Sequence, residues 1–245
     1  MHVKQRYQIT VQGRVQGVGF RPFIAVTAIK LNLSGWVRNI RQSVLIEIEG
    51  KPAEIETFLQ QLQENAPPVA KIEKVNKKQI NNKDDSGFQI LQSSGQNDGV
   101  VNISPDLGIC KQCQKELFSK GNRRYHYPFI SCPQCGPRYS ILKALPFDRS
   151  HTTLNDFPMC EACLQEYKDP ADRRFHAQGI NCQKCGPQVS YVNLQGQVIS
   201  QKEHTLADAI AALQAGKILA IKGLTGFHIV LDASNHQAVL RLRKR

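Results

Sequence analysis

The sequence lacks the features of a membrane or exported protein. No segment of the 245 residues approaches the roughly 18 uninterrupted apolar residues that a membrane helix requires. The first residues, MHVKQRYQITVQG, alternate polar and apolar side chains and contain no apolar segment typical of a signal peptide. We therefore expect a cytoplasmic protein that does not engage membranes.

Tryptophan and methionine are scarce, with one and two copies, and acidic residues are outnumbered by basic ones. The hydrophobic fraction of 41% still suffices for real cores, and the length favours more than one domain. The formal charge of +12 divides into +5, +3 and +4 over residues 1–92, 93–200 and 201–245. Because the excess is spread along the chain, anionic small molecules explain it as well as RNA does, and nucleic acid is not the expected partner.

One glycine-rich stretch, GRVQGVGFRPF at Gly13–Phe23, has the composition of an anion-binding loop. It lacks the Gly-Lys-Ser/Thr ending of a Walker loop and the acidic residue about twenty positions on of a dinucleotide loop. What remains is a set of backbone N–H groups at a helix N-terminus, where phosphate binds favourably. The expected phosphate-binding residues are Gln16, Gly17, Val18, Gly19, Phe20 and Arg21, with the Arg21 guanidinium gripping two oxygens.

No serine, cysteine or aspartate within this loop could act as a nucleophile. Chemistry on a phosphoryl group would therefore use water, and a neutral polar residue is needed to position it. Asn39, in the strand that follows the expected helix, is the candidate. Arg21 and Asn39 are thus the predicted catalytic pair.

The first 92 residues have the pattern of an α+β unit. Their order is strand, helix, strand, strand, helix, strand, which predicts a ferredoxin-like fold with two helices on one face of an antiparallel sheet. The expected strands are Arg6–Val11, Ser34–Ile40, Ser43–Glu49, Val69–Val75 and Phe88–Leu91, and the expected helices are Pro22–Leu33 and Pro52–Asn65. The middle two strands form a hairpin across Arg41 and Gln42.

All eight cysteines occur as Cys-x-x-Cys pairs in an internal repeat with a 50-residue offset. Eighteen residues separate the two pairs within each half. Identical residues in the two halves, besides the cysteines, are Glu116/Glu166, Arg123/Arg173, Arg124/Arg174, His126/His176, Ile130/Ile180, Gly136/Gly186, Pro137/Pro187 and Ser140/Ser190.

Two such pairs suit one tetrahedral zinc ion, and a site filled by four cysteines is structural. We expect two ions, one held by Cys110, Cys113, Cys132 and Cys135 and the other by Cys160, Cys163, Cys182 and Cys185. Two other pairings of the four motifs stay open, as does a disulfide framework, which no secretory segment supports. His126 and His176 are expected to pack or to face a substrate, because the cysteines already fill both sites.

The remaining segments complete a predicted organisation of four parts: 1–92, a polar linker at 93–104, the duplicated zinc-finger region at 105–190, and an incomplete α/β unit at 200–245. In the last part we expect a helix over Thr205–Ala215 with Thr205 and Asp208 as a weak capping box. A buried strand Lys217–Lys222, a second strand Phe227–Leu231 and a helix from Asn235 to Arg243 follow.

The glycine loop together with GWVRN at Gly35–Asn39 resembles the signature of acylphosphatase. The order of all segments resembles the N-terminal part of the HypF carbamoyltransferase family of nickel–iron hydrogenase maturation. The residues that carry this second resemblance are RRYHYPFISCPQCGP, LPFDRSHTTL and DPADRRFHAQ, and KGLTGFHIVLDA at Lys222–Ala233 is similar to the opening of a YrdC-like nucleotide-binding domain.

The resemblance implies a reaction sequence. Carbamoyl phosphate would be hydrolysed at the Arg21 site, and the carbamate would be activated with ATP in the YrdC-like domain and delivered to a cysteine of the partner HypE. Lys222 would belong to the nucleotide site. Because the chain covers only the first part of the family's length, we expect a fragment that retains the acylphosphatase step, with ATP required only by the complete protein. The alternatives are a zinc-ribbon RNA-binding module with a vestigial anion pocket, or an inactive gene remnant.

Overall fold

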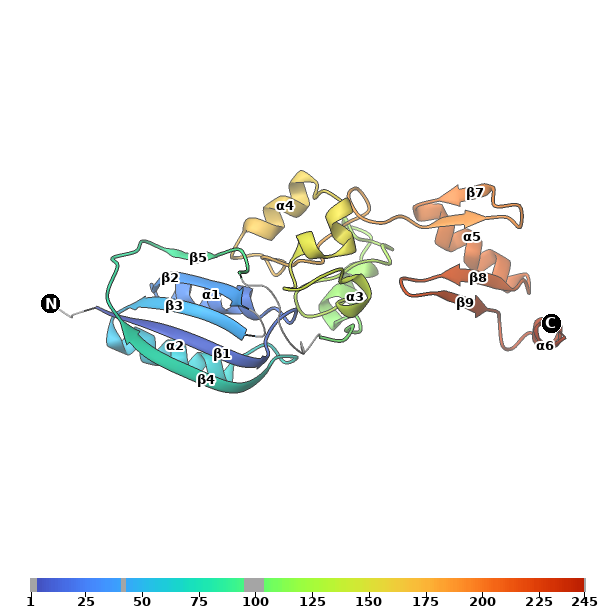
Figure 1. Cartoon of the computed structure of the whole chain (residues 1–245). Coiled ribbons are helices and arrows are strands. Elements are labelled where there is room, and N and C mark those ends of the chain that lie inside the picture. The colour runs from blue at the N-terminus through green and yellow to red at the C-terminus, as the bar shows by residue number, and fades with distance from the viewer. Residues whose placement is uncertain (1–3, 41–42, 95–103, 245) are drawn as a thin grey trace.

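The computed structural model describes residues 4–40, 43–94 and 104–244, which form three parts in chain order (Figure 1). A sheet domain (residues 4–94) is followed by a cysteine-rich region (residues 104–189) and a C-terminal segment (residues 190–244). The predicted hairpin turn at Arg41 and Gln42 and most of the predicted linker, residues 95–103, lie outside the described residues. Within the described ranges no helix is long and apolar enough to cross a bilayer.

The sheet domain contains five strands in the spatial order β4-β1-β3-β2-β5. Their bounds are β1 Gln5–Arg14, β2 Ser34–Ile40, β3 Ser43–Gly50, β4 Lys71–Ile80 and β5 Phe88–Ile90. The strand pairs β1–β3 and β2–β3 are antiparallel. Ile46 of β3 lies opposite Ile9 of β1 on one side and opposite Val37 of β2 on the other. These three side chains are fully buried on one face of the sheet.

Two helices, α1 (Phe20–Lys30) and α2 (Pro52–Glu64), supply the rest of the core. Ile24 of α1 and Phe58 and Leu62 of α2 are at most 1% exposed and pack in the same cluster as the inner strands. The predicted ferredoxin-like fold is therefore confirmed. One detail of the prediction is wrong, since β5 pairs parallel with β2 and the sheet is mixed rather than antiparallel.

The cysteine-rich region has little regular structure: helices α3 (Lys111–Leu117) and α4 (Glu161–Lys168) and the short 3₁₀ turns η1 (Tyr139–Ile141), η2 (Arg149–His151) and η3 (Thr153–Asp156). Its buried apolar residues form small separate clusters, two of them around the cysteines. A region with such small clusters cannot rely on hydrophobic burial alone, so ligation of the cysteines is expected to supply much of its stability.

The C-terminal segment contains two hairpins and two helices. Their bounds are β6 Ser190–Val192, β7 Val198–Gln201, α5 Glu203–Gln214, β8 Leu219–Lys222, β9 Phe227–Val230 and α6 His236–Arg243. The hairpin β6–β7 was not anticipated. Two predictions are wrong: β8 is largely exposed rather than buried, with Ile221 at 43%, and Thr205 does not cap α5, which begins at Glu203 after Lys202. The Thr205 hydroxyl instead donates to the Val189 carbonyl at 3.2 Å.

A buried ionic cluster crosses strands β1 and β3 of the sheet domain. The guanidinium of Arg6 is 0% exposed and donates to Glu47 at 2.7 Å and Glu49 at 3.0 Å, with Asp85 at 2.7 Å from the same group. Burial would raise the pKa of Glu47, and the hydrogen bonds from Arg6 reverse this and hold it below the usual value. The pKa of Glu49 is likewise lowered against the effect of burial, by the backbone N–H of Lys83 and by Arg6.

Replacing the buried cation tests this cluster. Arg6→Met is expected to lower the free energy of unfolding by about 3–5 kcal/mol at pH 7, because it removes the buried cation that Glu47 and Glu49 share. Urea unfolding followed by the fluorescence of the single tryptophan, Trp36, measures the change. Glu56→Gln is the control, since it removes only an exposed ion pair with Lys77 at 3.6 Å and is expected to cost less than about 1 kcal/mol.

The lowered carboxyl pKa values also fix a pH dependence. The stabilisation from Glu47 and Glu49 is complete above the unfolded-state pKa of about 4.3 and is lost as the pH falls through the lower folded-state values. The deficit of Arg6→Met should therefore shrink on acidification, because protonated carboxyls no longer need the cation. An equal deficit at pH 4 and pH 7 would contradict the assignment.

Candidate active site and metal centres

The glycine loop connects β1 to α1 and turns sharply before the helix. Gly17 and Gly19 have φ values of +69° and +76°, in the left-handed region that favours glycine. Gly19 is the N-cap of α1, and a Cβ there would lie 3.0 Å from the Cβ of Pro133 in the cysteine-rich region. The turn thus leaves the first N–H groups of α1 without partners inside the helix, facing a close neighbour from another part of the chain.

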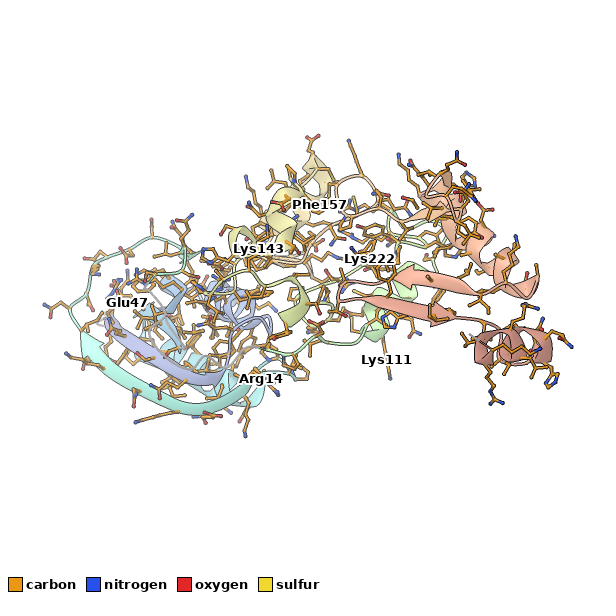
Figure 2. All side chains as sticks on the ribbon, turned by 45° about the vertical axis from the view of Figure 1, so that its right-hand side comes forward. Arg14, Glu47, Lys111, Lys143, Phe157 and Lys222 are labelled. Atoms are coloured by element: carbon orange, nitrogen blue, oxygen red, sulfur yellow. The ribbon has the colours of Figure 1, made fainter. Side chains whose placement is uncertain are left out.

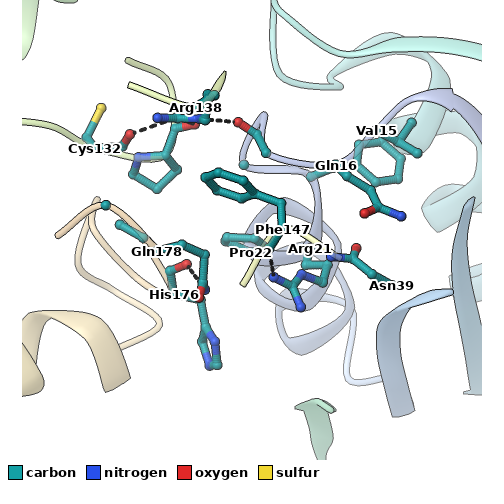
Figure 3. Close-up of a pocket in the computed structure, with 16 residues that line it drawn as sticks. Val15, Gln16, Arg21, Pro22, Asn39, Cys132, Arg138, Phe147, His176 and Gln178 are labelled. Atoms are coloured by element: carbon teal, nitrogen blue, oxygen red, sulfur yellow. Dashed lines mark hydrogen bonds between the residues drawn. The ribbon is translucent and has the colours of Figure 1, made fainter. Parts of the chain in front are cut away.

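Both predicted catalytic residues line one cavity of about 30 Å³ (Figure 3). Arg21 is in the first turn of α1, and Asn39 is on β2 and 1% exposed. Neither the amide oxygen nor the amide nitrogen of Asn39 has a hydrogen-bond partner among the described residues. A buried amide without partners is costly unless water or a ligand satisfies it, so this cavity is suited to hold one.

The predicted phosphate-binding residues divide into two groups. Gln16, Gly17, Gly19, Phe20 and Arg21 line the cavity. Val18 does not line it, because its side chain is fully buried in the core of the sheet domain.

Arg21 makes contacts that the sequence did not indicate. Its Nη2 donates to Oδ1 of Asp148 at 2.5 Å and to the carbonyl of Phe147 at 3.3 Å, and its Nη1 donates to the hydroxyl of Ser93 at 3.2 Å. Asp148 and Phe147 belong to the segment between the two cysteine repeats. The residue expected to bind an anion is therefore oriented by a carboxylate from a different part of the chain.

The cysteine-rich region lies against the glycine loop, and the side chain of Arg138 connects the two. Its guanidinium is almost fully buried and donates to the Gly17 carbonyl, and to the carbonyls of Cys132 at 3.1 Å, Pro133 at 2.8 Å and Cys135 at 3.1 Å. A buried cation held by carbonyl groups on both sides ties the glycine loop to the second cysteine motif.

His176 and His126 are equivalent in the repeat but differ in surroundings. Both have positive φ values, +50° and +55°. His176 lines the cavity beside Gln178, whereas His126 is exposed and stacks on Tyr125 with ring centroids 3.8 Å apart. Burial, with a smaller contribution from the charge of Arg21, lowers the pKa of His176 to about 4, so its ring is neutral at pH 7.

Sequence reasoning missed the contacts of Arg21 with Phe147 and Asp148, and the one signal for them is the segment Leu145–Leu154. It stands between the repeats, and the equivalent residues after the second repeat are unrelated to it. A non-repeated segment within a duplicated region is a candidate for a separate role. That signal does not reveal which residue it contacts, because Arg21 and Asp148 are far apart in the sequence.

The eight cysteines converge into two groups of four, Cys110/Cys113/Cys132/Cys135 and Cys160/Cys163/Cys182/Cys185. Within each group all sulfur atoms lie within 4.8 Å of one another. Representative Sγ–Sγ distances are 3.8 Å for Cys110–Cys132 and 3.5 Å for Cys163–Cys185. Four sulfurs about 2.3 Å from a tetrahedral zinc ion would be about 3.8 Å apart, so both groups fit such an ion.

The two repeats brace one another reciprocally. Arg123 and Arg124 of the first repeat bind Glu166 of the second, with closest distances of 2.7 and 2.5 Å. Arg173 binds Glu116 of the first repeat at 2.8 Å, and Arg174 binds the same carboxylate. These contacts are the same interaction used twice, as across a two-fold interface between identical subunits.

The same arginines also reach the cysteines of the opposite repeat. Nη2 of Arg123 lies 3.1 Å from the sulfur of Cys163, and Nη2 of Arg173 lies 3.0 Å from that of Cys113. Both sulfurs are fully buried. An N–H donor on a cysteine ligand favours the thiolate form that zinc requires, so each repeat supports the metal site of the other.

Lys222 belongs neither to the cavity nor to the two groups of cysteines. It lies on β8 of the C-terminal segment, with its ammonium 5.9 Å from the centre of the Phe227 ring, and it does not line the cavity (Figure 2). Its predicted nucleotide-binding role stays a prediction.

Two protein-family models match this chain. Residues 7–90 match the acylphosphatase model, and residues 109–142 and 159–192 each match the HypF finger model. An acylphosphatase of Syntrophotalea carbinolica is 44% identical over 68 residues, which are 27% of this chain and 73% of that protein.

Longer relatives match nearly the whole chain. The carbamoyltransferase HypF2 of Cupriavidus necator is 49% identical over 98% of this chain and 30% of its own length. The carbamoyltransferase HypF of Synechocystis is 51% identical over 97% of this chain and 31% of its own length. A crystal structure of full-length HypF in the phosphate- and nucleotide-bound form superposes with a TM-score of 0.88 at 41% identity, covering 99% of this chain and 32% of that one.

The chain therefore spans about a third of the length of these carbamoyltransferases, with the acylphosphatase match followed by the two finger matches. Zinc is the metal that the two four-cysteine groups and the finger matches suggest. On these grounds the chain belongs to the HypF carbamoyltransferase family and corresponds to its N-terminal part.

Proposed function

We propose that this chain hydrolyses acyl phosphates, carbamoyl phosphate in particular, in the cavity lined by Arg21 and Asn39. The observation that carries the proposal is the buried, unpartnered amide of Asn39 in the same cavity as the glycine loop and Arg21. The acylphosphatase match over residues 7–90 supports it, as does the phosphate-bound state in which a full-length HypF was crystallised.

The phosphate would lie against the first N–H groups of α1, with the Arg21 guanidinium on its oxygens. Helix N-termini and arginine both stabilise negative charge, and that stabilisation grows when the charge is concentrated in the transition state. The unpartnered amide of Asn39 would hold the attacking water through its oxygen.

The bond changes are those of hydrolysis at phosphorus. The water oxygen forms a new P–O bond while the bond between phosphorus and the acyl oxygen breaks, and the electron pair leaves with the acyl group as a carboxylate. For carbamoyl phosphate the leaving group is carbamate, and a phosphoryl oxygen takes the proton that the water gives up. No covalent enzyme intermediate is formed.

The zinc ions would be structural, each held by four cysteines with no open position. The proposal also includes a cytoplasmic location and a division of the chain into four parts, residues 1–92, 93–104, 105–190 and 200–245. In the complete protein, carbamate would pass to an ATP-dependent step that involves Lys222 and would reach a cysteine of HypE as a carbamoyl group. That proposal rests on the carbamoyltransferase relatives and on the nucleotide bound in one of them.

The hydrolytic step is tested by phosphate release from carbamoyl phosphate. Arg21→Ala is expected to lower kcat/KM about 10²–10³-fold, and Asn39→Ala by a similar factor, because each removes a group that stabilises or aligns the transition state. Arg14→Ala is the matched control, since Arg14 ends β1 and donates to the Val69 carbonyl at 2.9 Å without lining the cavity. Equal rates for wild type and Arg21→Ala would refute the proposed function.

The zinc sites are tested by metal analysis of the purified chain. Wild type is expected to hold two zinc ions, and Cys113→Ser or Cys163→Ser to hold one, because each site loses a buried ligand. Removal of both ions should unfold the cysteine-rich region, since binding contributes about 10–16 kcal/mol per site. Lys111→Ala, next to Cys110 but exposed, should keep both ions. A zinc-free chain with its cysteines oxidised in pairs would favour the disulfide framework instead.

A further inference from the structure

The cysteine-rich region places two hydrogen-bond acceptors against Arg21 that the hydrolytic step does not use: the carbonyl of Phe147, which lines the cavity, and the carboxylate of Asp148, which follows Phe147 in the chain and lies just outside the lining. The Asp148 carboxylate and the Phe147 carbonyl both lie against Nη2 of Arg21, at 2.5 and 3.3 Å. The side chain of Asp148 is 19% exposed, so it is mostly withdrawn from water. A carboxylate is an unusual neighbour for a site that binds an anion, and only one of its two oxygens accepts the hydrogen bond from Arg21.

The direction of the reaction indicates which part of the substrate meets these acceptors. In phosphoryl transfer the attacking and leaving oxygens are roughly in line. Asn39 lies on one side of the Arg21 guanidinium, and His176 and Gln178 lie on the other (Figure 3). A water held by Asn39 therefore expels the acyl group toward the cysteine-rich region.

We propose that the inter-repeat segment and the loop at His176–Gln178 form an acyl-group subsite that selects carbamoyl phosphate, with Asp148 as the residue that recognises the carbamoyl NH₂ group. This inference rests on the proposed function. A carbamoyl group has two N–H donors, which match the Asp148 carboxylate and the Phe147 carbonyl. The methyl group of acetyl phosphate has none and would add no hydrogen bond to the one that each acceptor receives from Arg21.

Arg21 can serve the phosphate and Asp148 together. A guanidinium has five N–H donors, and the hydrogen bonds to Ser93, Phe147 and Asp148 use only Nη1 and Nη2. The carboxylate therefore holds Arg21 in place and lies beside the acyl group of a phosphate bound to the same side chain.

The walls of the subsite are rigid and close. The amide of Gln178 donates to the Tyr167 hydroxyl at 3.0 Å and the His176 carbonyl at 2.7 Å, and its oxygen accepts from the backbone N–H of Arg149 at 2.9 Å. His176 is neutral at pH 7 and does not add a second charge. A cavity of about 30 Å³ between such walls is too small for an aromatic acyl group.

The test compares kcat/KM for carbamoyl, acetyl and benzoyl phosphate on the zinc-loaded 245-residue chain. Wild type is expected to prefer carbamoyl over acetyl phosphate by about 10- to 100-fold, the effect of one hydrogen bond to a charged acceptor, and to exclude benzoyl phosphate. Asp148→Asn and Asp148→Ala should lower the carbamoyl-to-acetyl ratio about tenfold or more. Asp156→Asn, which alters only an exposed pair with Lys143 at 3.1 Å, should leave the ratio unchanged.

The outcomes separate the two proposals. Arg21-dependent hydrolysis with no preference between carbamoyl and acetyl phosphate would overturn the subsite and leave the proposed function intact. A uniform change on all substrates in both Asp148 variants would also overturn it, because Asp148 would then only orient Arg21. Zinc content measured on each variant shows that the region is folded, and a shifted ratio at full zinc content supports the subsite.

Discussion

The ion pair between Arg21 and Asp148 joins two parts of the chain that have separate cores. Arg21 comes from the first turn of α1, where the glycine loop presents backbone N–H groups, and Asp148 comes from the segment between the cysteine repeats. Both side chains are largely buried, so the pair constrains the position of the cysteine-rich region over the loop. The shape of the cavity depends on this constraint.

The reciprocal contacts between the repeats make that constraint possible. Glu166 and Glu116 each accept hydrogen bonds from two arginines of the opposite repeat. Burial would raise the pKa of Glu166, but those arginines lower it to about 2, so the carboxylate stays charged at any pH near neutrality. In a region with few apolar residues, two metal sites and two ionic braces take the place of a hydrophobic core.

Much of this could be predicted from the sequence because local signals specify it. The glycine loop, Arg21 and Asn39 belong to one short βαβ segment, and the cysteine pairs follow from spacing. Asp148 and Arg138 could not be found this way, since their partners Arg21 and Gly17 are more than one hundred residues distant. The exposed strand β8 was misjudged because the apolar run KILAIK has the same pattern whether or not another element covers it.

Hydrolysis of acetyl phosphate in ¹⁸O-labelled water tests the central claim, water attack on phosphorus at the Arg21 site, most directly. Acetate does not exchange its oxygens readily, so the label reports which bond is broken. Our account predicts one ¹⁸O atom in the released phosphate, none in acetate, and loss of the labelled product in Arg21→Ala. Label in acetate, or labelled phosphate released equally by Arg21→Ala, would contradict it.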